Sequence, residues 1–283
     1  MQWELRFFHL SLINYALERG YSYTRWHSVS NTILFKEENN IRIHRTRVIH
    51  IDKADYNMVL GLKWRMAVYQ AEATHTLNDG QYGSRPRRNA VDPVIIEEVR
   101  FELSRITRRM FLQTNYDATA CYDCIIPDLA AIVSQKFGVH AKVTQSNART
   151  LHATKYNVRT ELGISETSYS HGEEDPIYGM GQGAGNALMA WGFLSCTLFN
   201  IYDKKATPAT YHNPDQSNPI ILAIIGVVDD SNGQVNRFLL VQDKDELRRM
   251  AEQASKNATI WAGLLGATGG ALELPKCSYH IMF

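Results

Sequence analysis

Hydrophobic and polar residues alternate along two segments near the N-terminus, residues 28–35 and residues 41–51. This two-residue period is typical of half-buried β-strands. Glu38, Asn39 and Asn40 lie between the two segments and are residues that favour a turn. The pattern therefore predicts a β-hairpin in this part of the chain.

Apolar residues recur every three or four positions in several other segments, which predicts helices. The expected helices cover residues 5–17 before Gly20, about 56–73, a segment starting at Asp92-Pro93, 127–138, 148–162, 187–199 and 244–265. We expect Asp92 to cap its helix and Pro93 to occupy the first helical position. The side of that helix predicted to face the core consists of Ile95, Val99, Leu103, Ile106 and Met110.

Two further apolar segments are predicted to be strands that end at carboxylates. Residues 110–116 lead directly to Asp117, and residues 220–228 lead to Asp229 and Asp230. A strand end is a good place for a functional side chain, because the strand fixes its position while the side chain stays accessible.

The second of these strands is expected to form one half of another hairpin. Its turn is predicted over residues 229–233 and its return strand over residues 234–240. A short last strand is expected after the Gly269-Gly270 turn. Helices and antiparallel strands are mixed without regular βαβ alternation, so the predicted fold class is α+β.

The composition fits a globular protein of one large or two modest domains. The 283 residues are 45% hydrophobic and 21% charged, and the formal net charge is +1. This charge argues against a histone-like polycation, but basic residues gather locally. The local cluster consists of Arg85, Arg87, Arg88, Arg100, Arg105, Arg108 and Arg109.

The four cysteines are too few for a disulfide scaffold and indicate a reducing compartment. Cys121 and Cys124 have the spacing of zinc ligands, but no second pair follows, which disfavours a zinc site. The N-terminus carries charges within its apolar stretch, unlike a signal peptide. The longest apolar runs are shorter than the roughly 20 residues that cross a bilayer. We therefore expect an intracellular protein, nuclear or cytoplasmic, without a membrane partner.

The three aspartates at the strand ends suggest chemistry with metal ions. Mg²⁺ prefers oxygen ligands, and two or three carboxylates plus substrate phosphates are enough to hold it. Asp229 and Asp230 are adjacent at the end of an apolar strand, where they repel each other unless a cation lies between them. The alternative is a solvated turn, because Asp-Asp-Ser-Asn-Gly is also a good turn sequence.

The order of motifs around these aspartates resembles that of reverse transcriptases. Residues 115–123 (NYDATACYD) resemble motif A, residues 179–183 (GMGQG) motif B, and residues 227–230 (VVDD) motif C; residues 81–90 (QYGSRPRRNA) are similar to the segment before motif A in retrotransposon enzymes, and residues 261–276 resemble the motif D region. Each motif alone is weak, but the set occurs in the family's order over roughly residues 24–280. The resemblance is to non-LTR-type retrotransposon enzymes.

The resemblance implies roles for the residues in motifs A, B and C. Asp117, Asp229 and Asp230 would be catalytic and would hold two Mg²⁺ ions, for which Mn²⁺ can substitute. Tyr122 would lie under the sugar of the incoming nucleotide and exclude a 2′-hydroxyl, which favours DNA synthesis. Gln182, with Gly183 beside it, would contact the nascent base pair.

The resemblance also implies roles for cations. Lys36 and Arg47, on the two strands of the first hairpin, would bind the triphosphate of the incoming nucleotide. Lys276 would be a proton donor to pyrophosphate. Arg85, Arg87 and Arg88 would contact the template and primer. Such a cluster binds phosphates, and this binding is independent of base sequence. For any of these cations alone, an exposed solvated side chain is the alternative.

The implied architecture is that of the fingers and palm of a right-hand polymerase, with an antiparallel palm sheet backed by helices. Residues 1–110 would form the fingers-like region and residues 111–283 the palm, with a fingers insertion near 139–175 and no thumb. Three positions depart from the family pattern. Ser84 replaces a usual phenylalanine, Arg87 a usual glycine, and Ala187-Leu188 a usual Ser-Pro.

The implied function is RNA-directed DNA polymerization by a retroelement enzyme, with an RNA template, a DNA or RNA primer and dNTPs as partners. Two alternatives stay open. One is a catalytically inactive nucleic-acid-binding retroelement relic. The other is an enzyme like an RNA-dependent RNA polymerase, because those enzymes use an aspartate near the position of Asp123 to contact the 2′-hydroxyl.

Overall fold

A computed structural model describes residues 2–37, 42, 46–119, 121–172, 176–212, 219–238 and 244–282. The chain divides into two compact units. The first consists of Met1–Ala71 and Ile125–Ala190, and the second of Glu72–Cys124 and Trp191–Phe283. Each unit is a group of residues in close contact. The expected division into fingers at residues 1–110 and palm at residues 111–283 stays a prediction.

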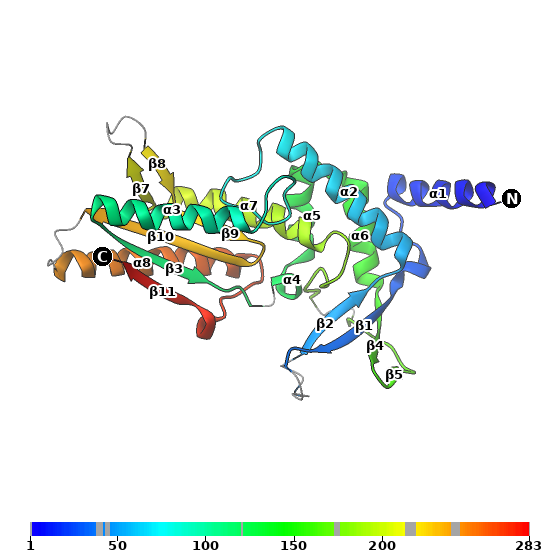
Figure 1. Cartoon of the computed structure of the whole chain (residues 1–283). Coiled ribbons are helices and arrows are strands. Elements are labelled where there is room, and N and C mark those ends of the chain that lie inside the picture. Colours follow the sequence, from blue (N-terminus) through cyan, green and yellow to red (C-terminus); the bar gives the residue numbers. More distant parts are fainter. Residues whose placement is uncertain are drawn as a thin grey trace. The chain divides into compact units, whose positions relative to one another are not determined.

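The first unit combines helices with a small mixed sheet (Figure 1). Its helices are α1 (Gln2–Arg19), the short η1 (Thr24–His27), α2 (Ala54–Ala73), α5 (Pro127–Lys136) and α6 (Ala141–Ala153). Its strands are β1 (Ser28–Phe35), β2 (Thr46–Ile51), β4 (Lys155–Thr160), β5 (Gly163–Ile164) and β6 (Tyr169–Ser170), in the order β2-β1-β4-β5 with β6 also paired to β4.

The first predicted hairpin is confirmed in its two strands. β1 and β2 are antiparallel, with Ser30 opposite Ile51 and Phe35 opposite Thr46. The expected turn at residues 38–40 lies outside the described residues. The predicted helices at 5–17, 56–73 and 127–138 correspond to α1, α2 and α5.

The predicted helix over residues 148–162 is wrong in its second half. The helix α6 ends at Ala153, and Thr154 already has extended backbone angles. The residues that follow form β4, which lies parallel to β1 from Ser28↔Lys155 to Thr32↔Arg159 and buries Tyr156. The helical spacing of apolar residues was therefore overruled by pairing with a distant strand, which satisfies the backbone hydrogen bonds of both.

The second unit is built on a four-stranded antiparallel sheet in the order β11-β3-β10-β9. These strands are β3 (Arg109–Tyr116), β9 (Ile224–Val227), β10 (Asp230–Phe238) and β11 (Ser278–Met282), and the surrounding elements are α3 (Val91–Thr107), α4 (Cys121–Cys124), α7 (Ala187–Lys205), α8 (Lys244–Ala267), η3 (Leu274–Lys276) and the hairpin of β7 (Ala209–His212) with β8 (Pro219–Leu222). The predicted strand at 110–116, the helix at 244–265 and the short last strand are confirmed.

Helices cover both faces of this sheet (Figure 1). On one face, Met110 and Leu112 of β3 pack with Met250 and Ala254 of α8. On the other face, Phe111 of β3 packs edge-on against Phe101 of α3, with ring centroids 5.5 Å apart. Successive side chains of a strand point to opposite faces, so this arrangement explains why β3 is buried along most of its length.

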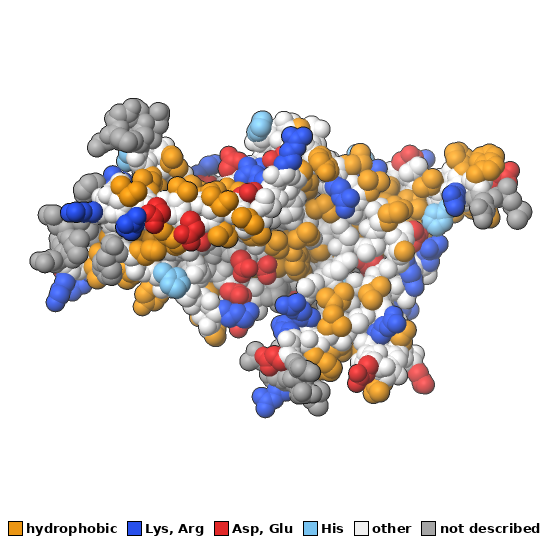
Figure 2. All heavy atoms as spheres, in the orientation of Figure 1, with side chains coloured by type: hydrophobic (Ala, Val, Ile, Leu, Met, Phe, Trp, Pro, Cys, Tyr) orange, Lys and Arg blue, Asp and Glu red, His pale blue; other side chains and the backbone are white. Residues whose placement is uncertain are grey.

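The predicted core-facing side of α3 is wrong over most of the helix, although Met110 is buried as a residue of β3. Ile95, Val99 and Ile106 are 56%, 60% and 72% exposed, whereas Arg100 and Ser104 are buried. Figure 2 shows hydrophobic side chains gathered over this helix. The reason lies in the sheet, whose face toward α3 carries the polar side chains Gln113, Asn115, Asn232, Gln234 and Asn236. A polar helix face therefore packs on a polar sheet face, and the apolar residues are left at the surface.

The start of α3 also differs from the prediction. Asn89, rather than Asp92, provides the cap, because its side-chain oxygen accepts hydrogen bonds from the backbone N–H groups of Val91 at 2.8 Å and Asp92 at 3.2 Å. Asp92 in turn accepts from the backbone N–H of Asn89 at 2.9 Å. The two residues thus form a reciprocal capping box. The helix begins at Val91, so Pro93 is its third residue and not the first.

The second predicted hairpin is present but its turn is shorter and earlier. The predicted strand at 220–228 is split at Ala223 into β8 and β9, and β8 pairs with β7, which was not predicted. β10 begins at Asp230 opposite Val227, so the turn consists only of Val228 and Asp229. Residues 231–233 belong to the return strand, while residues 239–240 lie outside the described part of the chain.

The predicted helix at 187–199 corresponds to α7, which continues to Lys205. No helix among the described residues is both long and apolar enough to cross a membrane.

The backbone at Arg87, one of the departures from the reverse-transcriptase pattern, keeps a conformation that suits glycine. Its φ is +64°, a backbone conformation that favours the glycine usual at this position of the family. We expect Arg87→Gly to raise the free energy of unfolding by up to about 1 kcal/mol, because relief of strain exceeds the entropy gained by the unfolded chain. Urea unfolding measures the change. Arg87→Ala is the control, since it removes the side chain but keeps the strain, and a glycine variant less stable than this alanine variant would contradict the prediction.

Candidate active site

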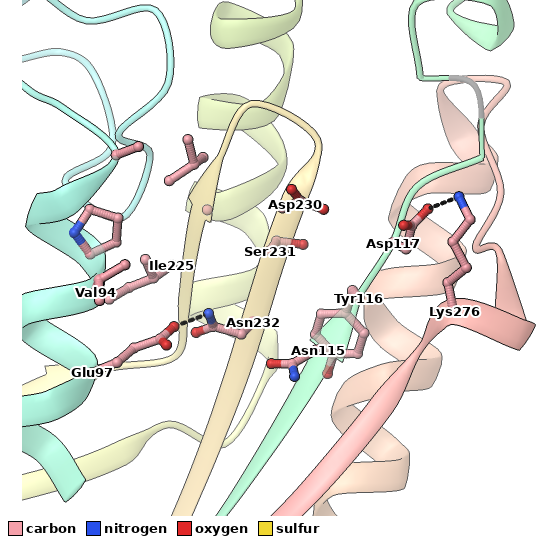
Figure 3. Close-up of a pocket in the computed structure, with 14 residues that line it drawn as sticks. Val94, Glu97, Asn115, Tyr116, Asp117, Ile225, Asp230, Ser231, Asn232 and Lys276 are labelled. Atoms are coloured by element: carbon pink, nitrogen blue, oxygen red, sulfur yellow. Dashed lines mark hydrogen bonds and ion pairs between the residues drawn. The ribbon is translucent and has the colours of Figure 1, made fainter. Parts of the chain in front are cut away.

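The pairing of β3 with β10 brings two of the predicted aspartates to the same end of the sheet. The last paired positions are Tyr116 opposite Ser231, and Asn115 is opposite Asn232. One residue further along each strand lie Asp117 and Asp230. Figure 3 shows both side chains at this end of the two strands. Cross-strand neighbours of like charge repel each other, so this arrangement is unfavourable in the absence of a cation.

Asp117 and Asp229 are both close enough to Asp230 to act on its carboxyl group. Partial burial raises the pKa of Asp230, and the carboxylates of Asp229 and Asp117 raise it further. The ammonium of Lys276 acts in the opposite direction. The negative charges of Asp117 and Asp229 therefore make it less favourable for Asp230 to lose its proton.

Tyr122 lies close to one of these aspartates, Asp229. Tyr122 belongs to the one-turn helix α4, which begins at Cys121, four residues after Asp117. Burial raises the pKa of its phenol, and the neighbouring Cys121 and the Asp229 carboxylate raise it further. Burial and Asp229 also raise the pKa of the Cys121 thiol. Both side chains are therefore neutral at physiological pH and present uncharged surfaces beside the carboxylates.

Lys276 contacts the first aspartate directly. Its ammonium lies 3.4 Å from Oδ1 of Asp117, and the Lys276 side chain is 63% exposed. The position of Asp117 is fixed through its backbone, since its carbonyl accepts a hydrogen bond from the N–H of Glu273 at 2.9 Å. Residues 273–276, which include η3, thus carry both the support for Asp117 and a cation that neutralises it.

The carboxylates do not form a closed set of ligands in this arrangement. Among the described residues, no group of three or more His, Cys, Asp or Glu side chains is placed to hold one metal ion. The chemistry of the donors suits Mg²⁺, because all three are carboxylates. The predicted metal site nevertheless stays a prediction.

A cavity of about 440 Å³ opens beside Asp117 and Asp230. Its walls combine residues of α3, β3, β9 and β10 with Lys276: Ala90, Pro93, Val94, Glu97, Asn115, Tyr116, Ile225, Gly226, Val227, Ser231 and Asn232 (Figure 3). A volume of this size suits a ligand as large as a nucleoside. Among the described residues, the buried hydroxyl of Ser231 and the buried side-chain oxygen of Asn232 have no hydrogen-bond partner.

Sequence reasoning missed the part of this cavity contributed by α3. Glu97 accepts a hydrogen bond from Asn232, which joins the helix to the hairpin that carries the aspartates. The polar residues at alternate positions of β10 were the signal that could have indicated a polar partner on the helix.

The loop with the motif B sequence lies in the first unit and is held against β2. The carbonyl of Gln182 accepts a hydrogen bond from the N–H of His50 at 2.7 Å. A Cβ atom added at Gly181 would lie 2.8 Å from Cγ of His50, and one at Gly183 would lie 2.6 Å from the His50 carbonyl oxygen. Both glycines also have positive φ, so this close approach requires glycine.

The two predicted triphosphate-binding cations also belong to the first unit. Arg47 lies on β2 opposite Leu34, and Lys36 follows the last residue of β1. Both side chains are exposed, at the same end of the hairpin. Their predicted role and that of Gln182 stay predictions.

The placement of Arg85 argues against its predicted contact with the template. Its side chain is only 5% exposed and forms two hydrogen bonds to the Glu72 carboxylate, at 2.8 and 2.9 Å. It also donates to the carbonyls of Asn78 and Gln81. A guanidinium engaged in this way supports the fold rather than a ligand.

The two neighbouring arginines are more accessible. Arg88 pairs with Asp79 at 2.7 Å and lies over the ring of Tyr82, with its guanidinium carbon 4.9 Å from the ring centroid. The side chain of Arg87 is exposed. Template contact stays a prediction for these two residues.

Comparisons with known proteins show the fold. No protein family and no curated protein matches the chain. Among solved structures, the chain is similar to telomerase from Candida albicans in complex with a TWJ fragment of telomeric RNA, with a TM-score of 0.54, 10% identity and coverage of 90% of this chain and 42% of that one. It is also similar to telomerase from Candida tropicalis with the same kind of RNA fragment, with a TM-score of 0.55, 11% identity and coverage of 92% and 41%.

Apo telomerase from Candida tropicalis gives a TM-score of 0.54 at 11% identity, with coverage of 90% of this chain and 45% of that one. The chain thus spans less than half the length of these three telomerase chains. At this level of identity the likeness establishes a fold like that of telomerase, a mixed α+β fold with antiparallel sheets.

Proposed function

We propose that this chain is the polymerizing part of a reverse transcriptase, an RNA-directed DNA polymerase of a retroelement. The observation that carries the proposal is the placement of Asp117 and Asp230 at one end of adjacent strands, with Asp229 in the tight turn beside them. Telomerase is itself a reverse transcriptase, so the similar fold supports the same class of reaction. The telomerase structures that contain RNA also support an RNA template as a partner.

In the proposed reaction, the 3′-hydroxyl oxygen of a primer attacks the α-phosphorus of a dNTP. The bond from that phosphorus to the bridging oxygen breaks, and pyrophosphate leaves. Bound Mg²⁺ would supply activation of the hydroxyl and neutralisation of the leaving group. Asp117, Asp229 and Asp230 would hold these ions, with nucleotide phosphates completing the set of ligands.

Lys276 has two successive tasks in this proposal. Its ammonium neutralises Asp117 while the site is empty of substrate, as the 3.4 Å contact suggests. With Mg²⁺ held by Asp117, the ammonium of Lys276 would be free to give a proton to pyrophosphate. Its largely exposed side chain has room to move.

Primer extension on an RNA template tests the proposal. We expect the chain to extend an annealed primer with dNTPs in the presence of Mg²⁺ or Mn²⁺, and to do so much less with rNTPs. Extension with rNTPs alone would instead indicate an enzyme like an RNA-dependent RNA polymerase. Extension that survives removal of Asp229 would overturn the assignment of the site.

A second candidate function is a nucleic-acid-binding domain without catalysis. The observation in its favour is that Asp117 is already neutralised by Lys276 and that the carboxylates do not form a closed set of ligands in the described residues. Such a protein would bind primer–template in a salt-dependent manner. It would not incorporate nucleotide, and Mg²⁺ or Mn²⁺ would not raise its stability.

Tyr122 provides a test of sugar selection. We expect Tyr122→Ala to raise the efficiency of rNTP incorporation relative to dNTP incorporation by about 10- to 100-fold, because the ring no longer excludes the 2′-hydroxyl. The ratio of kcat/KM values for matched rNTP and dNTP measures this effect. Tyr279→Ala is the control, since Tyr279 is a 70% exposed tyrosine on β11. An unchanged ratio in Tyr122→Ala would remove Tyr122 from the nucleotide site.

A further inference from the structure

The turn that carries Asp229 has a strained backbone. Val227 pairs with Asp230, so Val228 and Asp229 form a two-residue β-turn. The φ of Val228 is +59°, in the left-handed region that β-branched residues rarely adopt and that such turns usually fill with glycine. A conformation of this kind persists only where the surrounding structure imposes it.

The chain segment 80–83 supplies one part of that surrounding structure. Gln81 forms a parallel bridge with Gly226 of β9, and the N–H of Tyr82 donates to the Gly226 carbonyl at 2.8 Å. The N–H of Gly226 donates in turn to the carbonyl of Gly80 at 2.9 Å. This segment thus follows β9 toward the turn.

The end of the segment packs directly against the turn. A Cβ atom added at Gly83 would lie 2.4 Å from the backbone nitrogen of Val228 and 2.9 Å from its Cα. Only glycine allows two backbones to approach this closely. The backbone of Gly83 therefore limits where Val228 can lie.

Two buried side chains hold the carbonyl of Val228. The indole N–H of Trp191, a residue of α7, donates to it at 2.5 Å, and the side-chain amide of Gln81 makes a longer contact at 3.5 Å. Trp191 is 3% exposed and Gln81 is fully buried. The Gln81 amide is itself fixed, because it donates to the hydroxyl of Ser195 at 2.8 Å and accepts from the N–H of Gly83 at 2.8 Å.

We propose that Trp191 and Gln81 are positioning residues that fix the carbonyl of Val228 and, through the planar peptide unit that joins it to Asp229, the Asp229 carboxylate. The catalytic part of this inference rests on the proposed polymerase function. Since Asp229 is the only aspartate of the three within the turn itself, it depends most on this support. A displacement of about 1 Å at a reacting group lowers rates by about 100-fold, so loss of the support affects turnover more than substrate binding.

A matched pair of tryptophan variants tests the inference. Trp191→Phe removes the N–H that holds Val228. Trp261→Phe removes an indole of equal size that is 2% exposed in the same unit, and whose N–H has no hydrogen-bond partner among the described residues. The two variants lose similar packing, but only the first releases the turn.

Hydrogen exchange followed by mass spectrometry gives a readout that does not need catalysis. We expect the backbone amides of residues 226–232 to exchange at least about ten-fold faster in Trp191→Phe than in Trp261→Phe, with similar losses of thermal stability in the two variants. In primer extension, kcat of Trp191→Phe should fall about 10- to 100-fold below that of Trp261→Phe at a similar KM for dNTP.

Equal exchange rates of residues 226–232 in the two variants would show that Trp191 does not hold the turn. Faster exchange with equal kcat would overturn its part in positioning. If the unaltered chain extends no primer, the proposed function fails, whereas the exchange measurement still decides whether Trp191 holds the turn. If Trp191→Phe does not fold, Gln81→Met takes its place, with Gln234→Met as the control that removes another buried amide. The expected and contradicting outcomes are the same.

Discussion

Replacing Asp229 with asparagine is expected to lower primer extension by at least about 1,000-fold while the fold is retained. The carboxylate charge is what a two-metal reaction requires of this residue, and asparagine keeps the shape but not the charge. The loss should appear in kcat and kcat/KM together, because the interaction is needed most in the transition state. Single-turnover primer extension at saturating Mg²⁺ measures it.

Stability should move in the opposite direction from activity. The pKa of Asp230 is raised by burial and by its neighbouring carboxylates, so the folded protein holds this proton more tightly than the unfolded chain does. Such a group contributes most to stability at low pH, and that contribution is lost as the pH rises through the folded pKa. At neutral pH, Asp229→Asn removes one of the repelling charges, and Tm should be equal to or above that of the unaltered chain.

A carboxylate outside the site provides the control for this experiment. Asp245 lies on the first turn of α8, is 73% exposed and forms a surface pair with Arg248. Asp245→Asn is expected to leave primer extension within about two-fold, since exposed pairs of this kind contribute about 0–1 kcal/mol. Equal activity of the two variants would show that Asp229 carries no catalytic charge.

The parts of this site that depend on local patterns could be predicted from the sequence. The apolar character of residues 110–116 predicted β3, and the apolar run before Asp229 predicted the strand that leads into the hairpin turn. The motif order predicted that Asp117 and Asp230 belong to one site, and the register of β3 with β10 brings them to one end of the sheet. These features are encoded within short stretches of chain.

The features that failed prediction depend on residues far apart in the sequence. β4 exists because β1, more than 100 residues earlier, offers it a paired edge. The orientation of α3 depends on the polar face of a sheet formed by β3 and β10, which its own apolar stripe does not reveal. Likewise, the left-handed conformation of Val228 is imposed by Trp191 and the 80–83 segment rather than by turn-forming residues.

Arg85 shows the same limit for a single side chain, and its replacement is expected to have the largest effect on stability. Its sequence context suggested phosphate binding, whereas the structure buries it against Glu72 and two backbone carbonyls. Arg85→Met should lower the free energy of unfolding by about 3–5 kcal/mol, because it leaves the Glu72 carboxylate without its partner in a largely buried place. Urea unfolding followed by circular dichroism measures this loss.

Two further variants separate the buried ion pair from a role in nucleic-acid binding. The double variant Arg85→Met with Glu72→Met should be more stable than Arg85→Met alone, since no carboxylate is then left unpaired. Arg88→Met, which breaks a pair with the 92% exposed Asp79, should lower stability by only about 1 kcal/mol or less.

In salt titrations of primer–template binding, loss of a phosphate contact reduces the slope of log K against log salt by about 1. We expect no such reduction in Arg85→Met at temperatures where this variant is folded. A reduced slope together with little loss of stability would instead show that Arg85 contacts template phosphates.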